Sequence, residues 1–149
     1  MNDAKSKLAE KIVGIKKKKK WTWTQIAERV GMSPMWTTAA LLGQMSMLEP
    51  QAKIVAEMFG LSDDEKQTLM DIPYRGSLPT AVPTDPVIYR FYELIQVYGT
   101  TWKELIQEEF GDGIMSAIDF DMEMVRKPDP KGDRVQITMS GKFLSYKRY

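Results

Sequence analysis

The chain of 149 residues contains neither cysteine nor histidine. Without cysteine there can be no disulfide framework, no thiolate nucleophile and no thiolate metal ligand. Without histidine, the commonest general base and the commonest transition-metal ligand are both missing. Any catalytic chemistry must therefore rely on arginine, lysine, carboxylates, hydroxyls, backbone dipoles or a metal held by oxygen atoms.

The sequence also lacks a strong net charge and a long apolar run. Its 21 basic and 20 acidic residues nearly cancel, so no overall field favours a nucleic-acid partner. The longest uncharged run, residues 30–48, contains two glycines, a proline and other polar breaks and is not a membrane span. The first residues do not contain the apolar core of a signal peptide. We therefore expect a soluble protein of the cytoplasm without a membrane partner.

The first half of the chain has the pattern of several short helices. An amphipathic helix opens the chain and is followed by five consecutive lysines, Lys16–Lys20. Ser33 before Pro34 predicts one helix start, and Ser62 with Glu65 predicts a capping box at another. The lysine run could attract phosphate or an acidic partner, although such runs more commonly form a solvated helix end.

Residues 21–73 resemble the helix-turn-helix of phage-repressor-like DNA-binding domains. However, no lysine or arginine occurs between Arg29 and Lys53. The expected recognition helix therefore has no side chains for phosphate contacts, on which affinity for duplex DNA depends heavily. The pattern predicts the fold of such a domain but no DNA partner. A helix-turn-helix regulator that dimerises through its C-terminal half is retained as the alternative function.

A stretch rich in proline separates the two halves of the chain. Residues 72–86 contain four prolines and one glycine, and they cannot continue a helix from either side. We therefore predict a helical, helix-turn-helix-like domain over residues 1–76 and a small α+β domain over residues 77–149. The fold class of the whole chain is α+β.

The second domain is expected to begin with two helices. Asp85 can cap the first, and Pro86 at the first helical position loses no hydrogen bond. Gly99 is expected to end this helix, because glycine enters the left-handed region without a steric penalty. Thr101 followed by Glu104 then predicts a capping box for a second helix, which ends at Gly111. Five apolar residues at helical spacing predict a buried stripe on the first helix: Val87, Phe91, Leu94, Ile95 and Tyr98.

After residue 116 the apolar period changes to two, which predicts a β-hairpin around the turn at residues 128–132. The outward-facing Asp119, Asp121 and Glu123 could hold Mg²⁺ or Ca²⁺, and a metal-dependent hydrolase is a further alternative. Alternation alone already predicts polar residues at these positions, so a solvated face is preferred and no metal is expected. A lone hairpin is marginally stable in water, which favours self-association.

Three polar residues near this region are candidates for a site. Arg90 and Glu93 lie three positions apart on a flank of the first predicted helix, away from the centre of its apolar stripe. Such a pair contributes only about 0.2–0.5 kcal/mol on a solvated helix. Ser116 follows a Gly-Asp-Gly loop whose backbone N–H groups could converge on an anion. Spacing alone favours an ordinary surface pair and an ordinary turn serine.

A longer motif changes this interpretation. The run TDPVIYRFYELIQVYGTTWKELIQEEFGDGIMSAI, over residues 84–118, resembles the signature region of the cyanase (cyanate hydratase) family nearly without gaps. TTAALLGQ in the first half, IPYRG in the middle and GKFL near the end extend the resemblance over most of the chain. The C-terminal SYKRY and the five lysines depart from the family pattern, and neither includes the three candidate residues.

The resemblance implies that cyanate reacts with bicarbonate to give carbamate and carbon dioxide, and that carbamate then releases ammonia and carbon dioxide. It implies that Arg90, Glu93 and Ser116 are the catalytic residues, with bicarbonate as a co-substrate and no cofactor. Glu93 would either orient Arg90 or transfer a proton, and orientation is preferred. The resemblance also implies interlocked dimers arranged into a decamer, with active sites where subunits meet. The helical half would then serve the enzyme without contacting DNA.

Overall fold

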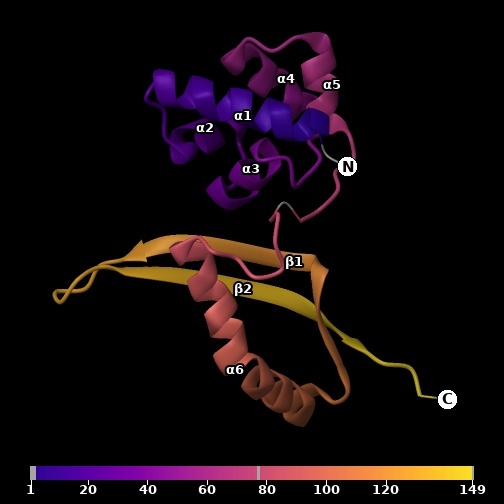
Figure 1. The fold of residues 1–149 in the computed structure, drawn as a ribbon. Helices are drawn as coiled ribbons and strands as arrows, with labels where there is room; N and C mark the ends of the chain where they lie inside the picture. The colour runs from indigo at the N-terminus through magenta and orange to yellow at the C-terminus, as the bar shows by residue number, and fades with distance from the viewer. Residues whose placement is uncertain (1–2, 77, 149) are drawn as a thin grey trace. The chain divides into compact units, whose positions relative to one another are not determined.

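The structure is a computed structural model that describes residues 3–76 and 78–148. The chain divides into two compact units, Met1–Ser77 and Leu78–Tyr149. Figure 1 shows helices alone in the described part of the first unit, and one helix with a two-stranded sheet in the second. The α+β fold class predicted from the sequence is confirmed.

The first unit contains five helices and the hydrophobic core. The helices are α1 (Asp3–Lys18), α2 (Trp23–Val30), α3 (Pro34–Leu41), α4 (Glu49–Phe59) and α5 (Asp63–Met70). Every one of these helices contributes apolar side chains to a single cluster. Its fully buried members come from four of the helices and include Ile12, Ile26, Leu41 and Val55. This unit therefore has a core within one chain.

The helix ends of the first unit follow the capping signals of the sequence. Ser33 accepts a hydrogen bond from the Trp36 amide at 3.1 Å, and Pro34 occupies the first turn of α3. Gly31 and Gly60 end α2 and α4 in the left-handed conformation, with φ of 80° and 63°. The start of α3 predicted at Ser33 and Pro34 is confirmed. A further capping box at the start of α2, between Thr22 and Gln25, was not predicted.

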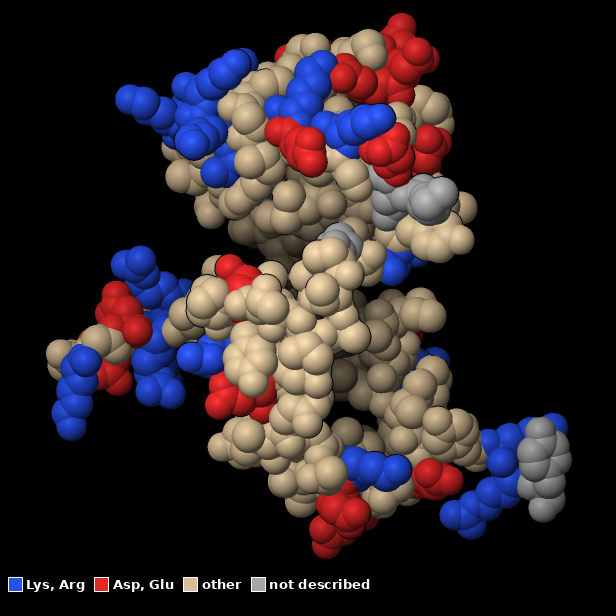
Figure 2. Space-filling model, in the orientation of Figure 1, with Lys and Arg blue, Asp and Glu red and all other residues tan. Residues whose placement is uncertain are grey.

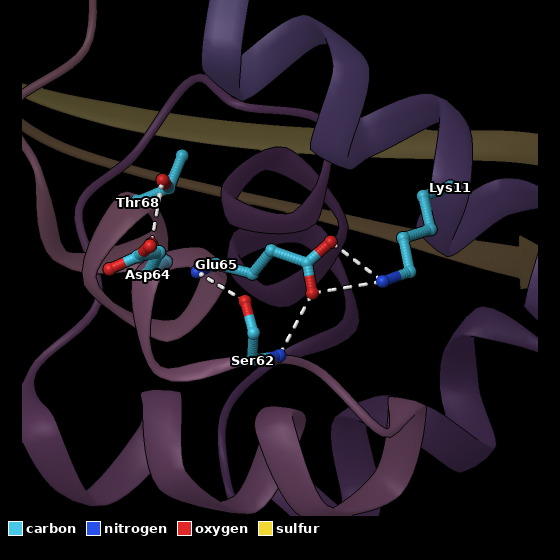
Figure 3. Close-up of polar contacts among 5 residues, drawn as sticks. All are labelled: Lys11, Ser62, Asp64, Glu65 and Thr68. Atoms are coloured by element: carbon cyan, nitrogen blue, oxygen red, sulfur yellow. Dashed lines mark hydrogen bonds and ion pairs between the residues drawn. The ribbon is translucent and has the colours of Figure 1, made fainter.

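An ion pair joins α1 to the capping box of α5 (Figure 3). The Ser62 hydroxyl accepts from the Glu65 amide at 3.2 Å, and the Glu65 carboxylate accepts from the Ser62 amide at 2.9 Å. The same carboxylate accepts from the Lys11 ammonium at 2.6 Å and 2.9 Å. The hydrogen bonds from Lys11 and from the Ser62 backbone lower the pKa of Glu65 below its ordinary value of 4.5. The predicted capping box is confirmed and is also a link between two helices.

The second unit consists of α6 (Pro86–Phe110), β1 (Gly113–Lys127) and β2 (Arg134–Ser145). The two strands pair in an antiparallel hairpin, and Figure 1 shows that they form a long ribbon. Phe110 at the end of α6 stacks on Phe143 of β2 with ring centroids 5.2 Å apart. The Tyr146 amide donates to the Asp112 carbonyl at 3.0 Å, which ties the end of β2 to the loop before β1.

The prediction of two helices between residues 86 and 110 is wrong. Asp85 caps the helix as expected, accepting from the amides of Val87 and Ile88 at 2.9 Å and 3.0 Å. The helix then continues without a break through Gly99 and Thr101. A glycine inside a helix costs about 1 kcal/mol relative to alanine. Ending the helix there would leave four carbonyls and four amides without intrahelical partners, so continuation is the better solution.

The predicted burial of the apolar stripe on α6 is also not found within one chain. None of the residues of α6 is buried. The five residues of the stripe are between 40% and 67% exposed: Val87, Phe91, Leu94, Ile95 and Tyr98. Every buried aliphatic, aromatic or methionine side chain among the described residues lies between Leu8 and Leu69. The second unit therefore has apolar faces but no apolar core of its own.

The Glu65 contacts predict a specific dependence of stability on pH. Because folding lowers the pKa of Glu65, its charge stabilises the first unit fully above the unfolded pKa, and this stabilisation is lost as pH falls through the lower folded pKa. We expect Glu65→Gln, which keeps an acceptor for the capping box, to be less stable than the natural chain at pH 7. The difference in stability between the two proteins should disappear below about pH 4. Thermal unfolding of both proteins between about pH 7 and about pH 2 measures this difference. A difference that stays constant down to about pH 2 would contradict the role given to the Glu65 charge.

Candidate active site

Arg90 and Glu93 lie near the N-terminal end of α6, where the Asp85 cap and Pro86 define the start of the helix. The Arg90 Nη1 and Glu93 Oε2 atoms are 3.4 Å apart, with side chains 69% and 51% exposed. The Arg90 guanidinium also lies 5.9 Å from the centre of the Tyr89 ring. An exposed ion pair of this kind contributes about 0–1 kcal/mol to stability. Stability alone therefore does not require this pair, and its cationic group is open to a ligand.

Ser116 lies in β1 at an irregularity of the hairpin. Met115 pairs with Phe143 and Phe120 with Gly141, so residues 116–119 of β1 lie opposite Lys142 alone. The Ser116 Oγ accepts hydrogen bonds from the amides of Ile118 and Asp119, both at 3.0 Å. Its side chain thus closes a tight local turn that interrupts the regular ladder. The sequence predicted a turn serine just past the loop, and the structure places the residue inside the strand.

These two hydrogen bonds decide what the Ser116 hydroxyl can still do. A serine hydroxyl has one donor and two acceptor sites, and here both acceptor sites face backbone amides. The O–H group has no acceptor among the described residues, and the residue is only 4% exposed. Ser116 is therefore a free hydrogen-bond donor held in one orientation, which suits an anion.

Gly141 on β2 allows this turn to approach the opposite strand closely. A Cβ atom at position 141 would collide with the Ser116 carbonyl oxygen and with Cγ of Met115. Only glycine leaves room for backbone at such a distance. The position of Ser116 thus depends on a residue that the sequence did not single out. Its sequence signal is a glycine in the middle of a strand, which commonly marks a bulge or a close approach.

The structure brings Arg90 and Glu93 into contact, but no direct polar contact joins either of them to Ser116 among the described residues. Within residues 3–76 and 78–148, the side-chain polar contacts of Ser116 are confined to its own turn, and those of Arg90 to Glu93 and Tyr89. One chain therefore presents the three candidate residues without a direct link between the ion pair and the serine.

A pocket of about 310 Å³ lies between the C-terminal half of α6 and the start of β1. Its apolar wall includes Trp102, Ile106 and Ile114, and Lys103 brings a positive charge to it. The sequence analysis did not predict this pocket. The available signal was the helical spacing of residues 99, 102, 103 and 106, which places them on one face of a continuous helix.

Two further expectations concern metals and membranes. Among the described residues, no group of three or more carboxylates is placed to hold a metal ion, so Asp119, Asp121 and Glu123 do not form a coordination site in one chain. In the same part of the chain, no helix is both long and apolar enough to cross a membrane.

Comparisons with known proteins give consistent results along the chain. Residues 5–73 match a family model described as cyanate hydratase, N-terminal, and residues 80–148 match the cyanate lyase C-terminal domain. A cyanate hydratase of Methylibium petroleiphilum is 66% identical over 142 residues, covering 95% of this chain and 97% of the relative. One of Dechloromonas aromatica is 63% identical over 145 residues, covering 97% and 99%. The crystal structure of a cyanase from T. urticae aligns with a TM-score of 0.79 and 36% identity, covering 93% of this chain and 96% of that one.

The close approach at Gly141 predicts a local effect on Ser116. We expect Gly141→Ala to displace the turn, because the added methyl group overlaps backbone that cannot move independently of the strand. Any activity that depends on Ser116 should fall by about tenfold or more, as small misplacements of reacting groups can cost about 100-fold. Gly14→Ala is the matched control, because no atom beyond its chain neighbours and its own helix backbone lies within 4 Å of the added methyl group. The measurement is the steady-state rate of folded Gly141→Ala beside that of folded Gly14→Ala. Equal rates would contradict the role given to Gly141.

Proposed function

The chain belongs to the cyanate hydratase (cyanase) family, and from this premise we propose that it decomposes cyanate in a reaction with bicarbonate. The observation that supports this most directly is the 57–66% identity to curated cyanate hydratases over nearly the whole chain. A non-enzymatic DNA-binding regulator has no support from these relatives. The family assignment names cyanate as the substrate. The use of bicarbonate as the second substrate goes beyond that assignment and is part of the proposal.

The proposed reaction has two steps. An oxygen atom of bicarbonate bonds to the cyanate carbon, and the cyanate nitrogen takes up the bicarbonate proton and one further proton. Cleavage of the bond between the bridging oxygen and the bicarbonate carbon then releases carbon dioxide and carbamate. Carbamate takes up another proton and separates into ammonia and a second carbon dioxide. No oxidant, reductant or cofactor is needed for the balance of atoms and electrons. The protein must bring two small anions together and supply positive charge and hydrogen-bond donors.

Arg90 is the proposed anion-binding residue. Two unit charges about 4 Å apart repel each other by about 1 kcal/mol in water and by about 4 kcal/mol at an effective dielectric constant of about 20. A guanidinium group offsets this repulsion at any working pH, because it does not lose its proton. Its planar donors also fit two oxygen atoms of a carboxylate-like anion at once. The exposure of the Arg90 side chain in one chain leaves these donors available.

Ser116 is proposed to donate a hydrogen bond to an anion or to the negative charge that develops in the reaction. Its two acceptor sites are already occupied by backbone amides, and this supports a donor role over a nucleophilic one. A nucleophilic serine also needs a neighbouring base. Among the described residues, no base lies within hydrogen-bond reach of its hydroxyl group.

Glu93 is proposed to orient Arg90. The distance of 3.4 Å between the carboxylate and the guanidinium supports this role, because it restrains the direction in which the guanidinium points. Transfer of a proton by Glu93 is the alternative retained from the sequence. An ionised Glu93 would repel the anionic substrates. Pairing of its carboxylate with the Arg90 guanidinium offsets this repulsion, which favours the orienting role.

We further propose that the active form is an assembly of identical chains, a decamer built from interlocked dimers. The exposed apolar faces of the second unit support this, since a stable fold buries such faces. The lack of a direct polar contact between Arg90 and Ser116 among the described residues also supports it, because neighbouring chains can supply further groups to each site. No nucleic acid, membrane or cofactor is included in the proposal. The cytoplasm stays the predicted location.

The first test is ammonia release from cyanate, measured with and without added bicarbonate. We expect release to depend on bicarbonate and Arg90→Ala to lower kcat/KM by about 100-fold or more, which corresponds to about 2.7 kcal/mol of transition-state stabilisation. Arg126→Ala is the matched control, because this exposed arginine is also paired with a carboxylate, that of Asp133, at 3.5 Å. Full activity of Arg90→Ala would overturn the site, and release that is indifferent to bicarbonate would overturn the co-substrate.

A second test uses dilution. Because the proposed site takes groups from neighbouring chains, we expect activity per chain to fall when the concentration drops below that at which the assembly dissociates. Sedimentation velocity and rate measurements on the same dilution series should give the same midpoint. A monomer that is stable and fully active would contradict the proposed assembly.

A further inference from the structure

The first unit has a basic half and an acidic half. Residues 3–30, which include α1 and α2, contain nine basic and three acidic residues, a balance of +6. Residues 49–71, which include α4 and α5, contain two basic and six acidic residues, a balance of −4. Residues 31–48 between them contain no charged residue. Figure 2 shows blue side chains gathered toward one end of this unit and red side chains toward the other.

The end of α1 forms a basic tip, Lys16–Lys20. The Lys16 ammonium lies 4.7 Å from the ring centre of Trp23, and the Lys19 ammonium lies 4.5 Å from that of Trp21. Lys17, Lys18 and Lys20 are exposed and have no side-chain partner among the described residues. Positive charges are stabilised at the end of a helix, but like charges at this density repel one another. The tip is therefore a surface that gains from a negatively charged partner.

The start of α5 forms an acidic turn, Asp63 and Asp64. Both residues are exposed, and neither carboxylate has an ion pair within the described residues. Their neighbour Glu65 is already paired with Lys11, and Glu49 of α4 is paired with Lys66. The acidic turn thus places two adjacent exposed carboxylates without an ion pair at one point of this half, although Asp63 lies near enough to Lys66 to raise the pKa of that ammonium.

The surroundings of the basic tip favour a protein partner over a nucleic acid. Single-stranded nucleic acids are bound by stacking their bases on exposed aromatic faces. Here each of the two tryptophans beside the tip has a lysine ammonium over its ring. The expected recognition helix contributes no cation for a duplex, since residues 31–48 are uncharged. An acidic protein surface therefore fits best, and each copy of the chain carries one.

We propose that the basic tip of one copy contacts the acidic turn of a second copy, so that the helical units associate head to tail. The inference rests on the self-association proposed above and names one of its contacts. A head-to-tail contact uses two different surfaces of each chain, and repeated around an axis it closes a ring. The contact is electrostatic, so it weakens as salt concentration rises. It gives the helical unit a role in assembly, without contact with substrate or DNA.

Charge reversal of the full-length chain tests this contact. One variant combines Lys17→Glu, Lys18→Glu and Lys20→Glu, which leaves the two lysines over the tryptophans in place. The other combines Asp63→Lys and Asp64→Lys. Each reversed variant faces like charge when alone, whereas a mixture of the two presents opposite charges at every mixed contact. Lys17→Arg, Lys18→Arg and Lys20→Arg together form the control, because the charge is kept.

Sedimentation velocity at low and high salt is the measurement. We expect each reversed variant alone to dissociate at a concentration about tenfold higher than the natural chain does at low salt. The equimolar mixture should recover the natural behaviour, and the arginine control should match the natural chain. If Asp63→Lys and Asp64→Lys disturb the start of α5, as circular dichroism would show, Asp63→Asn with Asp64→Asn replaces them and should remove the salt dependence.

Three results would overturn the inference. Natural assembly of both reversed variants at every salt concentration removes the contact, and so does a mixture of folded variants that fails to recover. Binding of a fluorescent single-stranded oligonucleotide that is lost in the lysine variant, with assembly unchanged, assigns the tip to nucleic acid. A natural chain that stays monomeric at low salt instead refutes the self-association on which the inference rests.

Discussion

Burial of apolar surface is the constraint on which the second unit depends, and the described residues of one chain leave much of that surface exposed. Its long helix and its hairpin both expose large apolar side chains, and Ile118 beside Ser116 is 98% exposed. Each fully buried large apolar side chain stabilises a fold by about 1.5–3 kcal/mol. Without this contribution, the stability of the second unit cannot be explained by one helix and the hydrogen bonds of its hairpin alone. In the assembly proposed above, the folding of this half and the formation of the site are therefore linked, whereas the helical unit has its own core.

The elements of the first unit could be predicted because their signals are local. A serine before a proline, a serine with a glutamate three residues later, and a glycine after an apolar run each determine a helix end through neighbouring backbone groups. The same reasoning was wrong at Gly99, where a glycine and a threonine with the same spacing lie inside a continuous helix. A local signal shows where a helix can begin or end. The complete set of backbone hydrogen bonds decides whether the chain uses it.

The residues of the candidate site could be named from the sequence, whereas their geometry could not be predicted from it. Arg90, Glu93 and Ser116 could be named because a long motif resembles one family, while their spacing alone indicated a surface pair and a turn serine. The interruption of β1 after Met115 and the close approach of Gly141 depend on the pairing of two strands. Pairing between residues more than twenty positions apart leaves no short-range pattern in the sequence. The exposure of the α6 stripe was missed for a related reason, because helical spacing predicts an apolar face but does not tell which chain covers it.

The turn closed by Ser116 also restricts how this sequence can change during evolution. In the proposed role, residue 116 accepts two amide hydrogens and donates one hydrogen from the same oxygen atom, and among the standard side chains only the hydroxyl of serine or threonine can do so at this position. Threonine is then the one substitution that keeps the hydroxyl group, and its additional methyl group must fit where residue 116 is only 4% exposed. An alanine variant would lose the backbone turn together with the donor, so its loss of rate would overstate the contribution of the hydroxyl to the chemistry.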